Sequence, residues 1–244
     1  MKTKMILLTA AFGLTSAFAF GQTITGLFTP VTENFSSYQG TEVTLPSGVS
    51  TFGSGFPNYG GFYDRDDSYS NSNLAYALRD NSSSSEIAFG MKRPASTAVA
   101  SLNWQLTNDT GGDITSFTIT WDAWQLSEAG RATELTLFNY NAGSGFTSDG
   151  LTSSTFTAST APSDANLSAI SVSPQSATIN LTSALEDGNS ITLGWRWLQG
   201  AGGGGNAHVG LTDISVTAIP EPSSIIMMAL AGLAAFGILR NRKK

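Results

Sequence analysis

The stretch ITSFTITWDAWQL, residues 114–126, decides the fold class of this chain. Phe117, Ile119 and Trp121 alternate with threonines, so apolar and polar side chains fall on opposite faces of an extended segment. The stretch SITLGWRWL at 190–198 has the same period of two. Both stretches are therefore predicted to be β-strands that bury one face.

Similar strand-like runs recur along the chain, at 74–79, 86–91, 98–107, 132–140, 176–182 and 209–218. Turn-forming residues separate these runs, and no amphipathic helical period appears between the two ends of the chain. We therefore predict an all-β fold, an antiparallel β-sandwich of jelly-roll-like type, over residues 22–218. NDTGGD at 108–113 indicates a hairpin, and the polar stretches 41–73 and 152–168 are expected to be long loops.

The composition restricts the possible functions of this domain. The chain has 244 residues with 12 basic and 18 acidic side chains, and half of the basic ones lie at the two termini. The body is therefore strongly acidic, which argues against a nucleic-acid partner. The chain contains no cysteine and one histidine, His208, so thiolate chemistry and the usual zinc sites are excluded.

Residues 1–21 have the pattern of a secretory signal peptide. Two lysines precede the apolar run 5–14, and small residues then offer cleavage after Ala19 or Gly21. We therefore expect the chain to be exported.

The chain ends with IPEPSSIIMMALAGLAAFGILRNRKK, residues 219–244. Ile225 begins and Leu239 ends an apolar run that would span about 22 Å as a helix, somewhat less than the roughly 30 Å of a bilayer core. A buried core helix is the alternative to a membrane helix. The basic cluster that follows favours the membrane helix, because it has the character of a stop-transfer signal: Arg240, Arg242, Lys243 and Lys244.

Two prolines before this run, Pro220 and Pro222, favour an extended backbone. Each proline fixes its own φ angle and disfavours the helical conformation in the residue that precedes it. Ser223 or Ser224 can cap the helix that follows. Pro220, Glu221, Pro222 and Ser223, followed by the apolar run and the basic end, resemble the PEP-CTERM sorting signal of Gram-negative bacteria. The resemblance implies recognition by an exosortase, a location at the cell envelope, cell surface or extracellular matrix, and association with exopolysaccharide and biofilm.

The body resembles a secreted bacterial β-sandwich module that occurs in anchored proteins and beside extracellular nucleases. The resemblance rests on YALRD, EIAFGM and the long runs from 106 to 140 and from 191 to 218. The pattern of that module has two successive acidic residues in its last strand, whereas this chain has Thr212 and Asp213. The resemblance implies a sandwich fold and no particular activity.

The best candidate for a metal site is DRDDSYSNSN at 64–73. Asp64, Asp66, Asp67 and Asn71 offer oxygen ligands of the kind that Ca²⁺ prefers. A solvated acidic loop without a metal is the alternative. No other cofactor is expected.

No catalytic motif is present in the sequence. The glycines from Gly200 to Gly205 formally match a nucleotide-binding pattern, but no helix is predicted after them, so a flexible hairpin loop is expected. His208 has no obvious serine partner and is expected to lie in a loop. Glycoside hydrolysis needs a pair of carboxylates, and no motif indicates which two residues would form it. The available carboxylates are those of Asp122, Glu128, Glu134 and Asp213.

Tryptophan side chains can stack on sugar rings, so they are candidates for glycan binding. Alternation assigns Trp121, Trp195 and Trp197 to the core, whereas Trp124 lies near the end of its strand and is the candidate. The alternative is that the tryptophans, Trp104 included, serve only to fill the core. The sequence thus favours a non-enzymatic surface or matrix component, with glycan binding as a candidate role. A secreted hydrolase acting on polysaccharide is the alternative.

Overall fold

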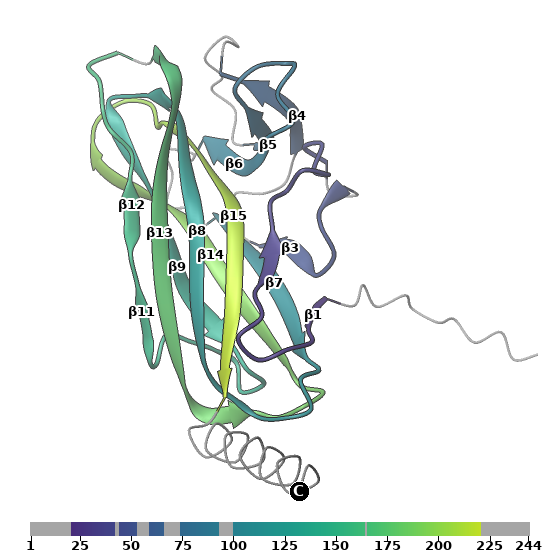
Figure 1. The fold of residues 1–244 in the computed structure, drawn as a ribbon. Helices are drawn as coiled ribbons and strands as arrows, with labels where there is room; N and C mark the ends of the chain where they lie inside the picture. The colour runs from purple at the N-terminus through teal and green to yellow at the C-terminus, as the bar shows by residue number, and fades with distance from the viewer. Residues whose placement is uncertain are drawn as a thin grey trace, which may run out of the picture.

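A computed structural model describes residues 21–41, 44–52, 59–65, 74–92, 100–163 and 165–220. These residues form strands, turns and irregular segments, with the strands arranged in two sheets (Figure 1). No helix within these ranges is long and apolar enough to cross a membrane. The expected signal peptide lies almost wholly outside the described residues, as do the expected membrane helix and the basic end.

The first sheet has seven strands in the order β1-β7-β14-β9-β10, with β12 added to β9 and β3 added to β7. Its strands are β1 (Gln22–Ile24), β3 (Val49–Phe52), β7 (Ala100–Asn108), β9 (Arg131–Asn141), β10 (Phe146–Thr147), β12 (Thr155–Thr157) and β14 (Ser190–Gly202).

The second sheet has eight strands in the order β11-β13-β8-β15-β6-β5-β4, with β2 added to β15. Its strands are β2 (Val31–Glu33), β4 (Tyr59–Asp64), β5 (Ala75–Arg79), β6 (Ala88–Lys92), β8 (Ile114–Glu128), β11 (Leu151–Ser153), β13 (Ala165–Leu185) and β15 (His208–Pro220).

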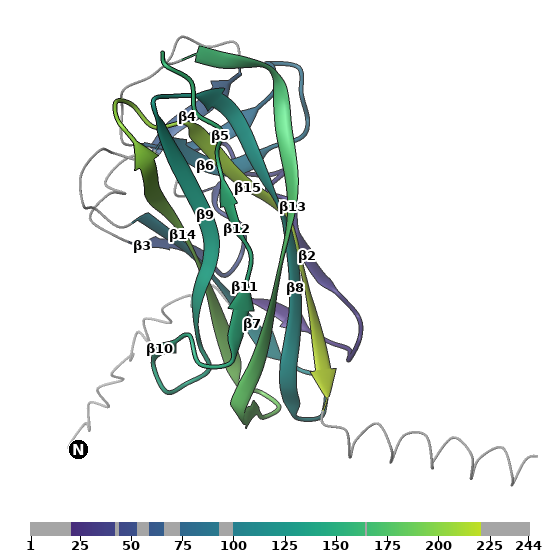
Figure 2. The same cartoon turned by 90° about the vertical axis from the view of Figure 1, so that its left-hand side faces the viewer.

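The two sheets form a sandwich (Figure 2). Side chains from both sheets form one large hydrophobic core. The ring centroids of Trp121 on β8 and Trp195 on β14 are 6.1 Å apart, with the planes nearly perpendicular. Trp197 on β14 donates its indole N–H to the carbonyl of Val209 on β15 at 2.9 Å, which satisfies a buried donor. The three tryptophans assigned to the core from the sequence are all buried, which confirms the period-two analysis.

The predicted all-β fold is confirmed, but its purely antiparallel character is wrong. β1 pairs with β7 in parallel, and β4 pairs with β5 in parallel. A parallel pair cannot be joined by a two-residue hairpin, and the ten residues 65–74 connect β4 to β5.

The six long strands alternate between the sheets as the chain proceeds: β7, β9 and β14 belong to the first, and β8, β13 and β15 to the second. The turn at 108–113 therefore joins the two sheets, and the expected hairpin there is wrong. Its residues do form a turn, in which the Asn108 side-chain amide donates to Gly112 O and Leu185 O. A turn-forming sequence predicts that the chain reverses direction, but it does not predict whether the two flanking strands pair with each other.

The two stretches expected to be long loops contain short strands. Residues 41–73 include β3 and β4, and residues 152–168 include β12 and the beginning of β13. β3, β4 and β12 lie at the margins of their sheets, where side chains remain partly exposed and an apolar pattern is not required.

A second, smaller apolar cluster covers part of the opposite face of the eight-stranded sheet. β8 keeps its alternation as far as Trp121, and then residues 123–127 are all buried, so both faces of the strand are covered there. Trp121 and Ala123 belong to the main core, whereas Trp124 and Leu126 point the other way. This outer cluster consists of Tyr63, Tyr76, Leu78, Ala88, Trp124 and Leu126.

Candidate functional site

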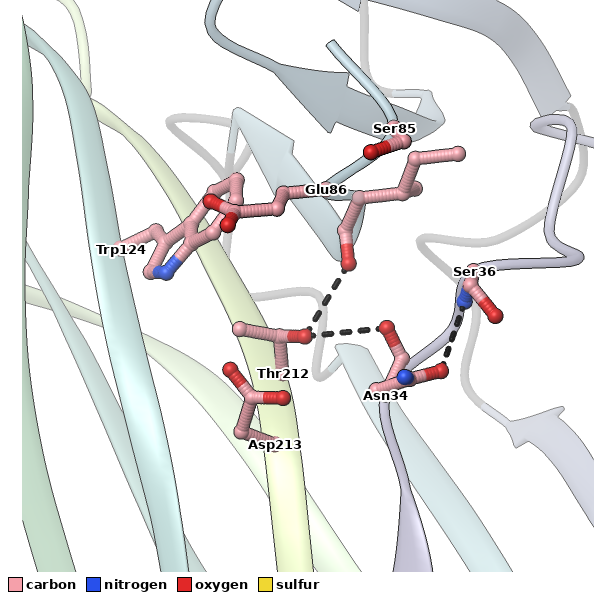
Figure 3. A pocket seen from close by; sticks show the side chains of 8 residues that line it. Asn34, Ser36, Ser85, Glu86, Trp124, Thr212 and Asp213 are labelled. Carbon is pink, nitrogen blue, oxygen red and sulfur yellow. Dashed lines mark hydrogen bonds between the residues drawn. The ribbon is translucent and has the colours of Figure 1, made fainter.

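A pocket of about 380 Å³ lies on this outer face, beside the smaller apolar cluster. Figure 3 shows polar side chains from three separate parts of the chain around it. They come from the segment after β2, the segment before β6 and the middle of β15, while β8 supplies one aromatic wall. The lining residues are Asn34, Ser36, Ser85, Glu86, Ile87, Trp124, Thr212 and Asp213.

Thr212 holds the two loop segments of the pocket against β15. Its buried hydroxyl lies 3.1 Å from Asn34 O and 3.0 Å from Ile87 O, so one side chain ties both segments to the strand (Figure 3). The Asn34 side chain accepts a hydrogen bond from Ser36 N at 3.1 Å, which shapes the turn after β2. Hydrogen bonds within the domain therefore fix the positions of the segments that line the pocket.

Asp213 occupies a β-bulge that turns its side chain toward the pocket. Thr212 pairs with Asp122 and Ser215 pairs with Thr120, so two residues of β15 face one of β8 between these pairs. Asp213 has a φ of 49°, a left-handed conformation that aspartate tolerates better than most residues. The additional residue allows Asp213 to be exposed while Ile214 lies in the core.

The bulge also brings two carboxylates close to each other. Although Asp213 is exposed, the protein removes part of its hydration, which raises its pKa above the ordinary value, and the nearby Asp122 carboxylate raises it further. Burial raises the pKa of Asp122 as well. Each group is thus easier to protonate than an isolated surface aspartate.

Asp213 also lines a second hollow of about 380 Å³, on the other side of the bulge. Its other lining residues come from β8 and β13. They are Thr120, Trp121, Asp122, Pro174, Gln175 and Ser176. Both hollows are therefore lined by the same carboxylate, that of Asp213.

The structure places the glycan-binding candidate Trp124 in the wall of the first pocket. Trp124 lies within β8, four residues before its end, and the residue is 4% exposed. Only a small part of the indole is therefore available to a ligand, and most contacts would come from the polar residues around it. Asn34 and Glu86 were not identified from the sequence, because each lies in a polar segment far along the chain from Trp124.

Of the four carboxylates considered for hydrolysis, the structure brings together Asp122 and Asp213. Glu128, at the end of β8, accepts a hydrogen bond from Ser159 Oγ at 2.8 Å. Glu134 lies on β9, in the other sheet.

Asp64, the one calcium candidate within the described residues, is held by an arginine. It pairs with Arg79 on the adjacent parallel strand, and the Arg79 guanidinium also lies 4.1 Å from the centre of the Phe62 ring. Asp66, Asp67 and Asn71 lie outside the described residues. Among the residues that are described, no group of three or more acidic or histidine side chains is placed to hold a metal.

The prediction that His208 lies in a loop is wrong. His208 is the first residue of β15, and it is fully buried. Its backbone N–H donates to Ser127 Oγ at 2.9 Å, and the same hydroxyl lies 3.0 Å from Nδ1 of the ring. The ring stacks on Tyr63 with centroids 4.1 Å apart. This serine–histidine pair was missed because its members are 81 positions apart, and its complete burial gives it a structural role.

The glycine-rich segment does not form a hairpin, because β14 and β15 belong to different sheets. It packs against the turn between β8 and β9, where Gly203 N donates to Gly130 O at 3.0 Å and Arg131 Nε donates to Gly202 O at 3.0 Å.

Pro220, the first proline of the sorting motif, is the last residue of β15 and is buried. It pairs with Ile114 at the beginning of β8. The remaining motif residues, Glu221 to Ser223, lie outside the described part of the chain.

Comparison with known families identifies a PEP-CTERM protein-sorting motif at residues 218–243, which confirms the resemblance seen in the sequence. This motif is a recognition signal for exosortase processing, and proteins that carry it are exported to the cell envelope or surface. No curated protein matches this chain.

Among solved structures, the chain is similar to the enzymatically active domain of tailspike protein 4 from bacteriophage CBA120. The identity is 9% and the TM-score 0.33, over 71% of this chain and 20% of the tailspike chain. This chain thus corresponds to about a fifth of that structure, and a likeness at this level carries no argument about function.

Proposed function

We propose that this chain is a non-enzymatic component of the cell surface or the extracellular matrix, and that its β domain binds glycan chains of the exopolysaccharide surrounding the cell. In this proposal a signal peptide directs export, and the apolar run after Ser224 holds the chain in the inner membrane until an exosortase processes it. The observation that carries the proposal is the sorting motif at 218–243, which follows directly from a folded two-sheet domain.

The two hollows on the outer face support a glycan ligand. Carboxylate, amide and hydroxyl groups around an aromatic wall are typical of sites that bind sugar hydroxyls. Glu86, Asn34 and Asp213 supply these groups in the first pocket, beside Trp124. Because Asp213 lines both hollows, a chain of several sugar units fits the surface better than a single sugar.

We also propose a jelly-roll-like description of the sandwich, supported by the alternation of its six long strands between the two sheets.

The alternative is a hydrolase that acts on polysaccharide, and one observation favours it. Asp122 and Asp213 lie close together, and the pKa of each is raised, as is needed for a carboxylic acid that donates a proton to a leaving group.

The test measures binding and turnover with purified exopolysaccharide from the producing strain. We expect the wild-type protein to bind it without releasing reducing ends, and Glu86→Gln to weaken the binding. Glu186→Gln, in the exposed turn at the far end of the domain, is the matched control and should bind like wild type.

Release of reducing ends that is abolished by Asp122→Asn would favour the hydrolase instead. Absence of binding by the wild-type protein would contradict the glycan-binding proposal.

A further inference from the structure

The sorting motif and the folded domain share residues. The motif covers 218–243, whereas β15 continues to Pro220, so Ala218, Ile219 and Pro220 belong to both. No linker separates the last strand of the domain from the signal that the sorting enzyme recognises.

The shared residues pair with β8 along one edge of β15. On one side, Ala218 pairs with Phe117, Ile219 with Ser116 and Pro220 with Ile114, all on β8. On the other side, the carbonyl of Ala218 accepts a hydrogen bond from Phe28 N at 3.0 Å. Ala218 and Pro220 are buried.

An enzyme that binds an extended segment uses the backbone edges and side chains of that segment. In this chain β8 already occupies one backbone edge as far as Pro220, Phe28 N occupies the carbonyl of Ala218 on the other, and the side chains of Ala218 and Pro220 are buried. Four residues, 221–224, separate Pro220 from the apolar run, and they span about 14 Å when fully extended. The chain therefore provides no free segment on the amino-terminal side of the motif.

We propose that the sorting enzyme and the β-sheet compete for Ala218, Ile219 and Pro220, so that the end of β15 must separate from β8 before the motif is processed. This inference rests on the exosortase sorting described above. The end of the strand is suited to local opening: the pairing with β2 stops at Val216, and a register shift falls between Ile219 and Pro220. The stability of the domain end thereby sets the rate of sorting.

The experiment frees the motif from the domain in the full-length chain. The spacer variant carries Gly-Ser-Gly-Ser-Gly-Ile-Pro inserted directly after Pro220, so that β15 keeps its own end and the enzyme receives a second Ile-Pro before Glu221. The control variant carries a seven-residue Gly/Ser insertion between Ser144 and Gly145, in the exposed turn after β9. Pulse-chase labelling in the producing strain, with intact mass, follows conversion of the precursor to the processed form.

We expect the spacer variant to be processed about five- to thirtyfold faster than wild type, which is the factor expected for opening a few terminal pairs. The control variant should be processed at the wild-type rate. Equal rates for the spacer variant and wild type would overturn the proposal.

A second measurement does not depend on processing. Amide hydrogen exchange of Phe28, whose N–H is bonded to Ala218 O, should be slowed at least fivefold relative to a free chain, because that bond breaks when the strand end opens. Exchange at the free-chain rate would overturn the proposal.

A third variant separates this inference from the sorting function itself. If Glu221→Ala with Pro222→Ala is processed as fast as wild type, the sorting proposal fails, whatever the spacer does.

Discussion

Asp213 shows how one backbone irregularity creates a polar site. Without the bulge, the residue after Thr212 would face the core, and a carboxylate there would lose its hydration. The left-handed conformation at Asp213 allows the strand to place it outside, next to Asp122, at the cost of repulsion between two carboxylates.

We predict that Asp213→Asn stabilises the protein at neutral pH. The pKa of Asp213 is raised in the folded state, so its contribution to stability is complete below the ordinary pKa of about 4 and is lost as the pH rises through the raised value. Asparagine is neutral and also tolerates a left-handed conformation. The melting temperature should therefore exceed that of wild type by a few degrees at pH 7 and equal it below pH 4.

The control is Asp109→Asn, which makes the same change in net charge in an exposed turn. The explanation fails if both variants raise the melting temperature equally, or if Asp213→Asn has the same effect at both pH values.

At the scale of elements, the connections between the sheets depend on close backbone packing. The glycine-rich segment after β14 lies against the turn between β8 and β9, and a Cβ added at Gly130 would lie 2.1 Å from Gly203 O. Gly203 O is a backbone atom, so it cannot move away from an added methyl group as easily as the end of a flexible side chain could.

We predict that Gly130→Ala destabilises the protein by about 1–3 kcal/mol, because the new methyl group must displace the glycine-rich segment. At Gly112 an added Cβ meets no atom within 4 Å, so Gly112→Ala should change stability by less than about 0.5 kcal/mol. Urea unfolding followed by circular dichroism measures both. Equal effects of the two substitutions would contradict this account of the connection.

The sequence predicted those strands whose core-facing side chains are consistently apolar. β8, β9 and β14 were located within a few residues because their alternation is clear. β13 was recognised only at 176–182 of its 21 residues, since much of its remainder is exposed and polar. The sequence did not predict that the pocket residues lie together. Asn34 and Glu86 come close to Trp124 only because strands far apart in the sequence pair with one another.

At the scale of the whole molecule, the domain and the sorting signal form a continuous chain. β15 lies between β8 and β6 and ends at Pro220, where the motif continues (Figure 1). We propose that this motif routes the exported domain to the cell envelope or surface.

The most direct test is cell fractionation, with intact mass, of the full chain carrying Glu221→Ala and Pro222→Ala. Pro220 is kept, because it completes β15 and its loss would disturb the fold. Ser82→Ala with Ser83→Ala, in an exposed turn, is the control. We predict that the motif variant is exported but accumulates in the inner membrane with an unprocessed C-terminus, while the control matches wild type. A motif variant with the mass and location of the wild-type protein would contradict the account.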